Sequence, residues 1–135
     1  MLVIDASAAT ELLLGRAPAS VIADHVAEHG YDLHAPHLID VEVLSAVRRL
    51  VASGDASAER ADAVVIDLLD LPLARYPHDI LLPRIWALRD NLSAYDAAYV
   101  ALAEGLADDG VPLLTTDARL AGAVRAHTDL DVLAA

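Results

Sequence analysis

The sequence has 135 residues, no cysteine and a formal net charge of −12, from 21 acidic residues against 9 basic ones that are all Arg. A chain of this length forms one domain and buries roughly two-thirds of its unfolded surface, so we predict a single domain over residues 1–135. The lack of cysteine excludes a disulfide scaffold and thiol catalysis, and the lack of Lys excludes P-loop and Schiff-base chemistry. The acidic balance argues against a general nucleic-acid binder.

The composition also limits the core and the cellular location. With no Phe, one Trp and one Met, the core must be filled by Leu, Val, Ile and Ala. The first Arg is Arg16, and no run of 18 uncharged apolar residues occurs. We therefore expect neither a secretory signal nor a membrane span, and we predict a cytoplasmic protein.

Short apolar strands alternate with helical patterns along the chain. The predicted elements are, in order, a strand at 2–4, helices at 7–14 and 18–29, a strand at 32–35, helices at 38–52 and 57–69, a strand at 71–75, helices at 79–90 and 93–107, a strand at 111–115, a helix at 118–127 and a strand at 131–133. Ser7 and Asp79 are the predicted caps of their helices. This order predicts an α/β fold, a three-layer α/β/α sandwich with a short central parallel sheet.

Four carboxylates fall where such a sheet binds ligands, outside the carboxyl ends of its strands. Asp5 ends the first strand, Asp117 follows the strand at 111–115, Glu42 lies early in the helix after the second strand, and Asp96 lies in the first turn of the helix at 93–107. A structural role is open for two of them, since Asp117 could cap the helix that follows and Asp96 fits a capping box.

If the four carboxylates converge, their charges must be compensated. Two like charges about 4 Å apart repel by roughly 4 kcal/mol at an effective dielectric constant near 20. Arg119 is the one basic residue close in sequence to any of them. A hard divalent cation such as Mg²⁺ is the natural compensation, and two such ions support phosphodiester hydrolysis.

Longer stretches of the sequence resemble a known family. They are residues 3–7, 35–44, 89–104 and 113–120, of which the most specific are Tyr-Asp-Ala-Ala-Tyr-Val-Ala-Leu-Ala at 95–103 and Leu-Leu-Thr-Thr-Asp at 113–117. In this order they resemble the PIN-domain ribonucleases, specifically the VapC-type toxins of bacterial toxin–antitoxin pairs. The resemblance implies that residues 1–135 are a single PIN domain.

The resemblance also implies an activity and a site. Asp5, Glu42, Asp96 and Asp117 match the family's acidic positions, which are catalytic and hold Mg²⁺ or Mn²⁺. Ser7, Thr115 and Thr116 match positions that orient carboxylates or metal-bound water, with helix capping as the alternative. The implied function is endonucleolytic RNA cleavage that inhibits translation and is neutralised by a cognate antitoxin, in a protein that forms homodimers.

Two Arg residues are candidates for contacting the RNA. Arg84 and Arg89 are predicted to bind phosphate, with surface ion pairs as the alternative. Trp86, between them, is predicted to lie in the core or in a dimer interface. The acidic excess predicts a weak, metal-dependent grip on RNA.

Two other functions remain as alternatives. The first is a non-catalytic PIN-fold module that only binds a partner protein. The second is an aspartate-nucleophile phosphatase, which would need a second Asp where this chain has Ser7, and a Lys.

Overall fold

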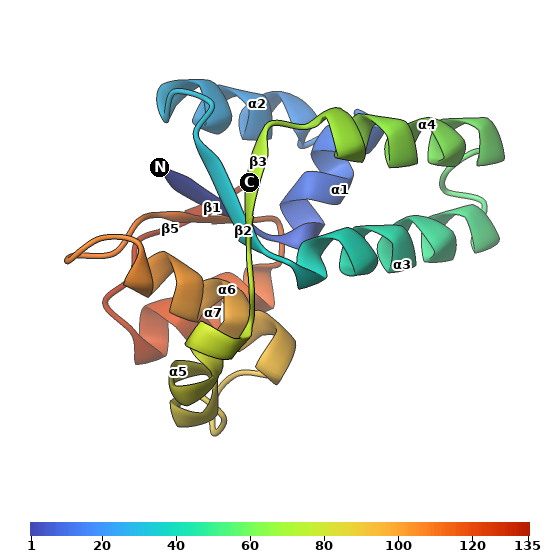
Figure 1. Cartoon of the computed structure of the whole chain (residues 1–135). Helices are drawn as coiled ribbons and strands as arrows, with labels where there is room; N and C mark the ends of the chain where they lie inside the picture. The colour runs from blue at the N-terminus through green and yellow to red at the C-terminus, as the bar shows by residue number, and fades with distance from the viewer.

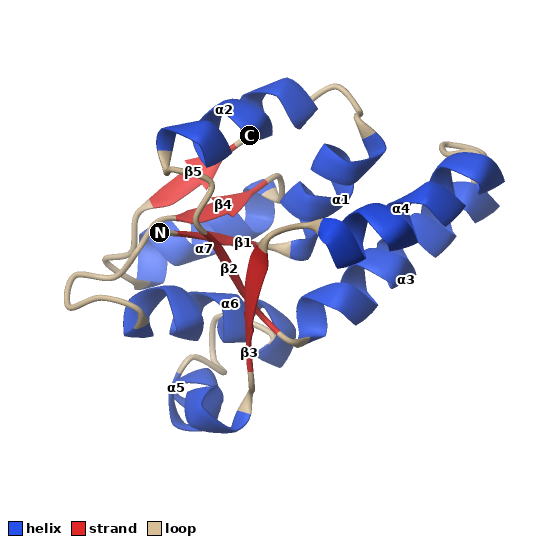
Figure 2. Cartoon of the chain, turned by 45° about the horizontal axis from the view of Figure 1, so that its top comes forward, coloured by secondary structure: helices blue, strands red, loops and turns tan.

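A computed structural model describes residues 1–135 and contains five parallel strands in one sheet, in the spatial order β3-β2-β1-β4-β5 (Figures 1 and 2). The strands are β1 (Leu2–Ile4), β2 (Leu33–Pro36), β3 (Leu73–Tyr76), β4 (Leu113–Thr115) and β5 (Val132–Ala134). All five predicted strands are present, and the α/β sandwich with a short parallel sheet is confirmed.

Seven α-helices flank the sheet. They are α1 (Ala6–Leu14), α2 (Ala19–Glu28), α3 (Leu38–Ala52), α4 (Ala58–Asp70), α5 (Leu82–Ala87), α6 (Ala94–Gly105) and α7 (Ala118–His127), and a short 3₁₀ helix, η1 (Asp79–Leu81), precedes α5. Helices α1 and α2 lie on one side of the sheet and α5, α6 and α7 on the other, while α3 and α4 pair and extend away from it (Figure 1). No helix is long and apolar enough to span a membrane.

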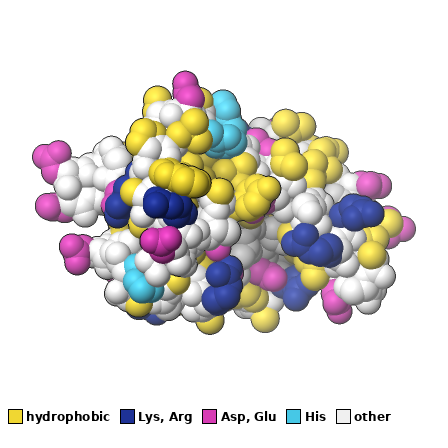
Figure 3. Space-filling model, turned by 90° about the horizontal axis from the view of Figure 1, so that it is seen from below, with side chains coloured by type: hydrophobic (Ala, Val, Ile, Leu, Met, Phe, Trp, Pro, Cys, Tyr) yellow, Lys and Arg dark blue, Asp and Glu magenta, His cyan; other side chains and the backbone are white.

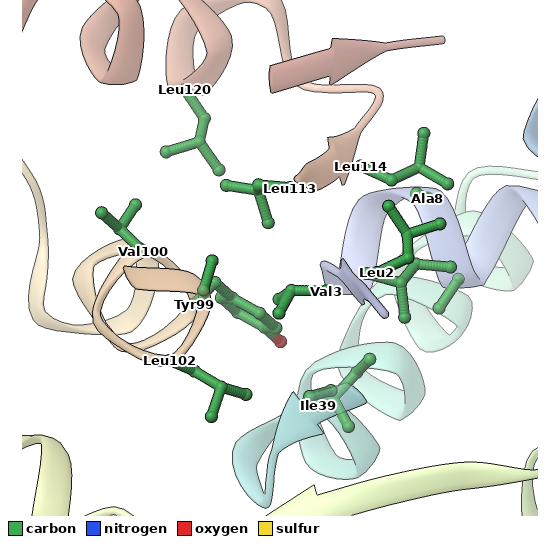
Figure 4. Packing of buried hydrophobic residues seen from close by; sticks show 14 of the residues in the cluster. Leu2, Val3, Ala8, Ile39, Tyr99, Val100, Leu102, Leu113, Leu114 and Leu120 are labelled. Carbon is green, nitrogen blue, oxygen red and sulfur yellow. The ribbon is translucent and has the colours of Figure 1, made fainter. Parts of the chain in front are cut away.

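The core contains the residue types that the composition predicts. One cluster of 33 buried residues is made of Leu, Val, Ile and Ala with a single aromatic residue, Tyr99. Figure 4 shows the Tyr99 ring reaching from α6 toward Val3 of the central strand. A buried tyrosine needs a partner for its hydroxyl group, and that requirement leads to the site described below.

Two local predictions are wrong, and one of two alternatives for Trp86 is excluded. Ser7 is not the cap of α1, because the Asp5 carboxylate accepts the hydrogen bond from the Ala8 amide at 2.9 Å. The segment predicted as one helix over 79–90 splits into η1 and α5, and Asp79 does not cap α5. Trp86 is 68% exposed, with the Arg89 guanidinium 4.6 Å from its ring, so it is not in the core and the dimer interface stays a prediction.

The strand order places one crevice at the centre of the sheet. β1 pairs with β2 on one side and with β4 on the other, and Ile4 lies beside Leu114. From β1 the chain continues to β2 on one side and later returns to β4 on the other side. Parallel sheets bind ligands at the carboxyl end of the strands where the order reverses in this way. Asp5 follows Ile4 directly and so lies beside Thr115 at this point.

Candidate active site

Asp5 is the most buried acid of the chain, with 4% of the residue exposed. Its Oδ1 accepts from the Ser7 hydroxyl at 2.6 Å and from the Ala8 amide at 2.9 Å, and its Oδ2 accepts from the Thr115 hydroxyl at 2.5 Å. Three donors fix its orientation. A carboxylate held in this way is capping α1 and at the same time facing the crevice between β1 and β4.

The two hydroxyls that hold Asp5 are themselves held by the backbone. The Thr116 amide donates to Ser7 Oγ at 3.0 Å, and the Asp117 amide donates to Thr115 Oγ1 at 3.0 Å. Each hydroxyl has one proton to give, and these incoming bonds leave that proton for Asp5. The loop after β4 thus orients Asp5 through Ser7 and Thr115, whereas Thr116 contributes its amide rather than its hydroxyl.

The environment of Asp5 opposes its negative charge. Burial, with a smaller contribution from the charge of Asp96, raises the pKa of the Asp5 carboxyl from 3.8 to about 6 against the lowering effect of its three hydrogen bonds. Asp5 is therefore ionised at pH 7 at a cost in folding free energy. A cation in the crevice would recover that cost.

Glu42 meets the hydroxyl of Tyr99. Helix α3 carries Glu42 into a half-buried position, where its Oε1 accepts from Tyr99 Oη at 2.6 Å. Burial raises the pKa of the Glu42 carboxyl, and the charge of Asp96 adds to this effect, while the Tyr99 bond and Arg49 oppose it. Burial and the bond to Glu42 also raise the pKa of Tyr99, so the phenol stays protonated and remains a donor.

Asp96 and Asp117 share one guanidinium group. Nη2 of Arg119 lies 3.0 Å from Asp96 Oδ2 and 3.4 Å from Asp117 Oδ2. Asp117 also caps α7, because its Oδ1 accepts from the amides of Arg119 and Leu120 at 2.9 and 3.2 Å. Ser93 caps α6 by accepting from the Asp96 amide, which leaves the Asp96 carboxylate free to face Arg119.

All four acids line one pocket of about 230 Å³ at the carboxyl edge of the sheet. The other lining residues are Ala6, Ser7, Ala46, Arg49 and Tyr99. Figure 3 shows this side of the molecule, with acidic atoms near its centre and Arg side chains around them. The acids offer only carboxylate oxygens as ligands, and burial, with the charge of Asp96, raises the pKa values of Asp5 and Glu42; both features fit a hard divalent cation. No three of these side chains are close enough together to hold an ion as they stand.

The predicted site residues divide into two groups. The four acids, Ser7 and Thr115 come together, and Thr116 joins them through its backbone amide, whereas Arg84 and Arg89 do not line the pocket. Arg84 pairs with Glu104 at 3.1 Å, and Arg89 stacks on Trp86.

Three residues of the site were not predicted: Tyr99, Arg49 and the role of Arg119. Spacing could have indicated two of them. Tyr99 is one helical turn after Asp96, and Arg49 is two turns after Glu42, so each lies on the same helix face as an acid of the site.

Comparisons with known proteins assign the chain to a family. A family model described as "PIN domain" matches residues 2–125. The α/β fold with four acids at one edge of its sheet is thus accompanied by a sequence match over most of the chain. The chain belongs to the PIN-domain family.

Individual relatives are similar over nearly the whole chain. Ribonuclease VapC12 of Mycobacterium tuberculosis is 40% identical over 134 residues, which cover 99% of this chain and 100% of the relative. Ribonuclease VapC1 of the same species is 43% identical over 122 residues, 90% of this chain and 89% of the relative. The crystal structure of PAE2754 from Pyrobaculum aerophilum aligns with a TM-score of 0.65 at 24% identity, over 97% of this chain and 81% of that one, and supports the fold.

Proposed function

We propose that this chain is a divalent-metal-dependent endoribonuclease, the toxin of a toxin–antitoxin pair, which cleaves RNA phosphodiester bonds and so inhibits translation. One observation carries the proposal. Four acids from four separate segments line one pocket, in a chain 40–43% identical to proteins named ribonucleases.

In this proposal Asp5, Glu42, Asp96 and Asp117 are the catalytic residues and hold Mg²⁺ or Mn²⁺. When bound, such ions supply an activated water and a counter-charge for the leaving oxygen. Asp5 would offer a carboxylate oxygen in a fixed direction, since Ser7 and Thr115 hold it from behind. Tyr99 would do the same for Glu42, because its hydroxyl occupies Oε1 and leaves Oε2 to face the pocket.

The partners follow from the same family resemblance. The substrate is RNA, the inhibitor is a cognate antitoxin protein, and the chain acts as a homodimer in the cytoplasm. Contact with the RNA phosphates falls to Arg residues, of which Arg49 lines the pocket while Arg84 and Arg89 lie farther away.

The test uses the purified full chain with a set of structured RNAs, in Mg²⁺, in Mn²⁺ and in a chelator. We expect internal cleavage with either ion and none in the chelator. Asp96→Asn should abolish cleavage, and Asp62→Asn, which neutralises an exposed acid on α4, should leave it unchanged. Cleavage that survives Asp96→Asn or the chelator would refute the proposal.

The same proteins separate the enzyme from a non-catalytic binding module. A calorimetric titration with Mn²⁺ should show binding to the wild-type chain and loss of binding in Asp96→Asn. A wild-type chain that binds no Mn²⁺ and cuts no RNA would favour the module.

A further inference from the structure

Arg119 contacts the acidic pocket in a way that capping of α7 does not explain. The backbone amide of Arg119 already serves the cap, since it donates to Asp117 Oδ1. Its side chain nevertheless reaches Asp96 on another helix, and a single nitrogen atom, Nη2, lies between the carboxylates of Asp96 and Asp117. One positive charge therefore bridges two acids that come from different elements of the fold.

The position of this charge matters because of what surrounds it. Asp96 lines the same pocket as Asp5, Glu42 and Asp117, and Arg119 is the residue whose guanidinium group bonds its carboxylate. The Arg119 guanidinium group is charged at every pH of interest, and the hydrogen bond to Asp96 and the charge of Asp117 raise its pKa further. It thus compensates the charge of two of the four acids that line the pocket.

The ion pairs of Arg119 with Asp96 and Asp117 are also weak. The side chain of Arg119 is 69% exposed, whereas that of Asp96 is 19% exposed and that of Asp117 35%. Ion pairs with one exposed partner contribute little free energy, and a long Arg side chain can move into solvent without leaving a cavity. A divalent cation could therefore replace it at small cost.

We propose that Arg119 is an internal competitor of the divalent cation. In the metal-free protein its guanidinium group occupies the position between Asp96 and Asp117, and the cation must displace it to bind. Arg119 is accordingly a positioning residue that sets the metal concentration at which the pocket fills. The proposal rests on the function proposed above only for the identity of the pocket as a metal site.

The experiment measures Mn²⁺ affinity of the full chain by calorimetry, without RNA. Removal of one positive charge next to the ion, together with the lost competition, should tighten Mn²⁺ binding about five-fold in Arg119→Ala. Arg119→Gln keeps a hydrogen-bond donor without the charge and should bind Mn²⁺ about as tightly as Arg119→Ala does. This variant serves if the alanine variant folds poorly. Arg125→Ala removes an equal charge from the same helix and should change the affinity less than two-fold, since Arg125 bonds the Val132 carbonyl instead.

Weaker Mn²⁺ binding in the Arg119 variants would indicate a structural role for this residue. If Arg119 only held the acids in place, its removal would loosen them and weaken Mn²⁺ binding. Unchanged or weaker binding in both Arg119 variants would therefore overturn the proposal, even if wild-type RNA cleavage is found. Conversely, tighter binding in a chain that cuts no RNA would uphold the competition and refute the ribonuclease.

Discussion

Substitution of Asp5 by Asn should make the metal-free protein more stable at neutral pH, although it removes a central residue of the site. The pKa of the Asp5 carboxyl is raised by burial from 3.8 to about 6. A folded-state pKa above the unfolded one means that the neutral acid stabilises the folded state. This contribution is fully present below the unfolded value and is lost as the pH rises through about 6.

The size of the effect follows from these two values. At about 1.4 kcal/mol per pH unit, ionisation of Asp5 lowers the free energy of unfolding by about 3 kcal/mol in total. About half of that loss, roughly 1.4 kcal/mol, falls between pH 5 and pH 8. Asn cannot ionise and escapes this loss.

The surrounding donors can accommodate Asn. Its carbonyl oxygen can keep the bonds from Ser7 and the Ala8 amide, and its amide nitrogen can donate to Thr115 Oγ1. The Thr115 hydroxyl then turns to Ser7 Oγ, which lies 3.2 Å away. Every polar group retains a partner, so the substitution should cost little in hydrogen bonding.

The assay is urea unfolding of both chains in a chelator at pH 5, 6, 7 and 8. The difference in unfolding free energy between Asp5→Asn and wild type should grow by about 1.4 kcal/mol in favour of Asn from pH 5 to pH 8. Asp62→Asn, which replaces an exposed acid on α4, is the matched control, and its difference in unfolding free energy from wild type should not follow the trend of Asp5→Asn. A flat difference for Asp5→Asn would refute the reasoning that burial controls this carboxyl.

Three further predictions concern the neighbours of the site. Tyr99→Phe removes the donor that fixes Glu42 and should weaken Mn²⁺ binding about ten-fold by calorimetry with a loss of stability near 1 kcal/mol; unchanged affinity would mean that Glu42 does not need this bond. Asp96→Asn should lose Mn²⁺ binding, and in a chelator its unfolding free energy should stay within about 0.5 kcal/mol of wild type, since the lost ion pair with exposed Arg119 and the relieved repulsion of Asp5 and Glu42 oppose each other. Arg75→Ala breaks the bidentate pair of Arg75 with Asp40, at 2.8–3.0 Å, and should lower the unfolding free energy by about 1–2 kcal/mol in urea while Mn²⁺ affinity stays the same.

The sequence predicted the fold well because each strand has a local signal. β1 is three buried apolar residues that end at an acid, and β4 is apolar up to its Thr-Asp end, so short runs of the chain were enough to place both. The segment around Asp79 failed for the opposite reason. Its apolar residues suggested one helix, whereas Pro83 has no amide hydrogen to donate to the preceding turn, so α5 begins there and η1 precedes it.

The acids of the site could be predicted from the sequence, but the side chains that bond to them could not. Asp5 and Asp117 follow strands directly, and the topology of a parallel sheet brings such positions to one edge. The bond from Tyr99 to Glu42 joins residues 57 positions apart, and it depends on how α3 and α6 approach each other across the edge of the sheet. No periodicity within one helix encodes that distance.

The net charge of −12 now has a more specific meaning than a general objection to RNA binding. The site places four acids in one pocket and holds one Arg between two of them, so the local charge is negative until a cation arrives. Under the proposed function, an RNA phosphate that approaches this pocket would be repelled unless the cation is bound first. The proposed function therefore implies that metal binds before RNA, and Arg119, if displaced as proposed above, would become a free positive charge at the rim of the pocket.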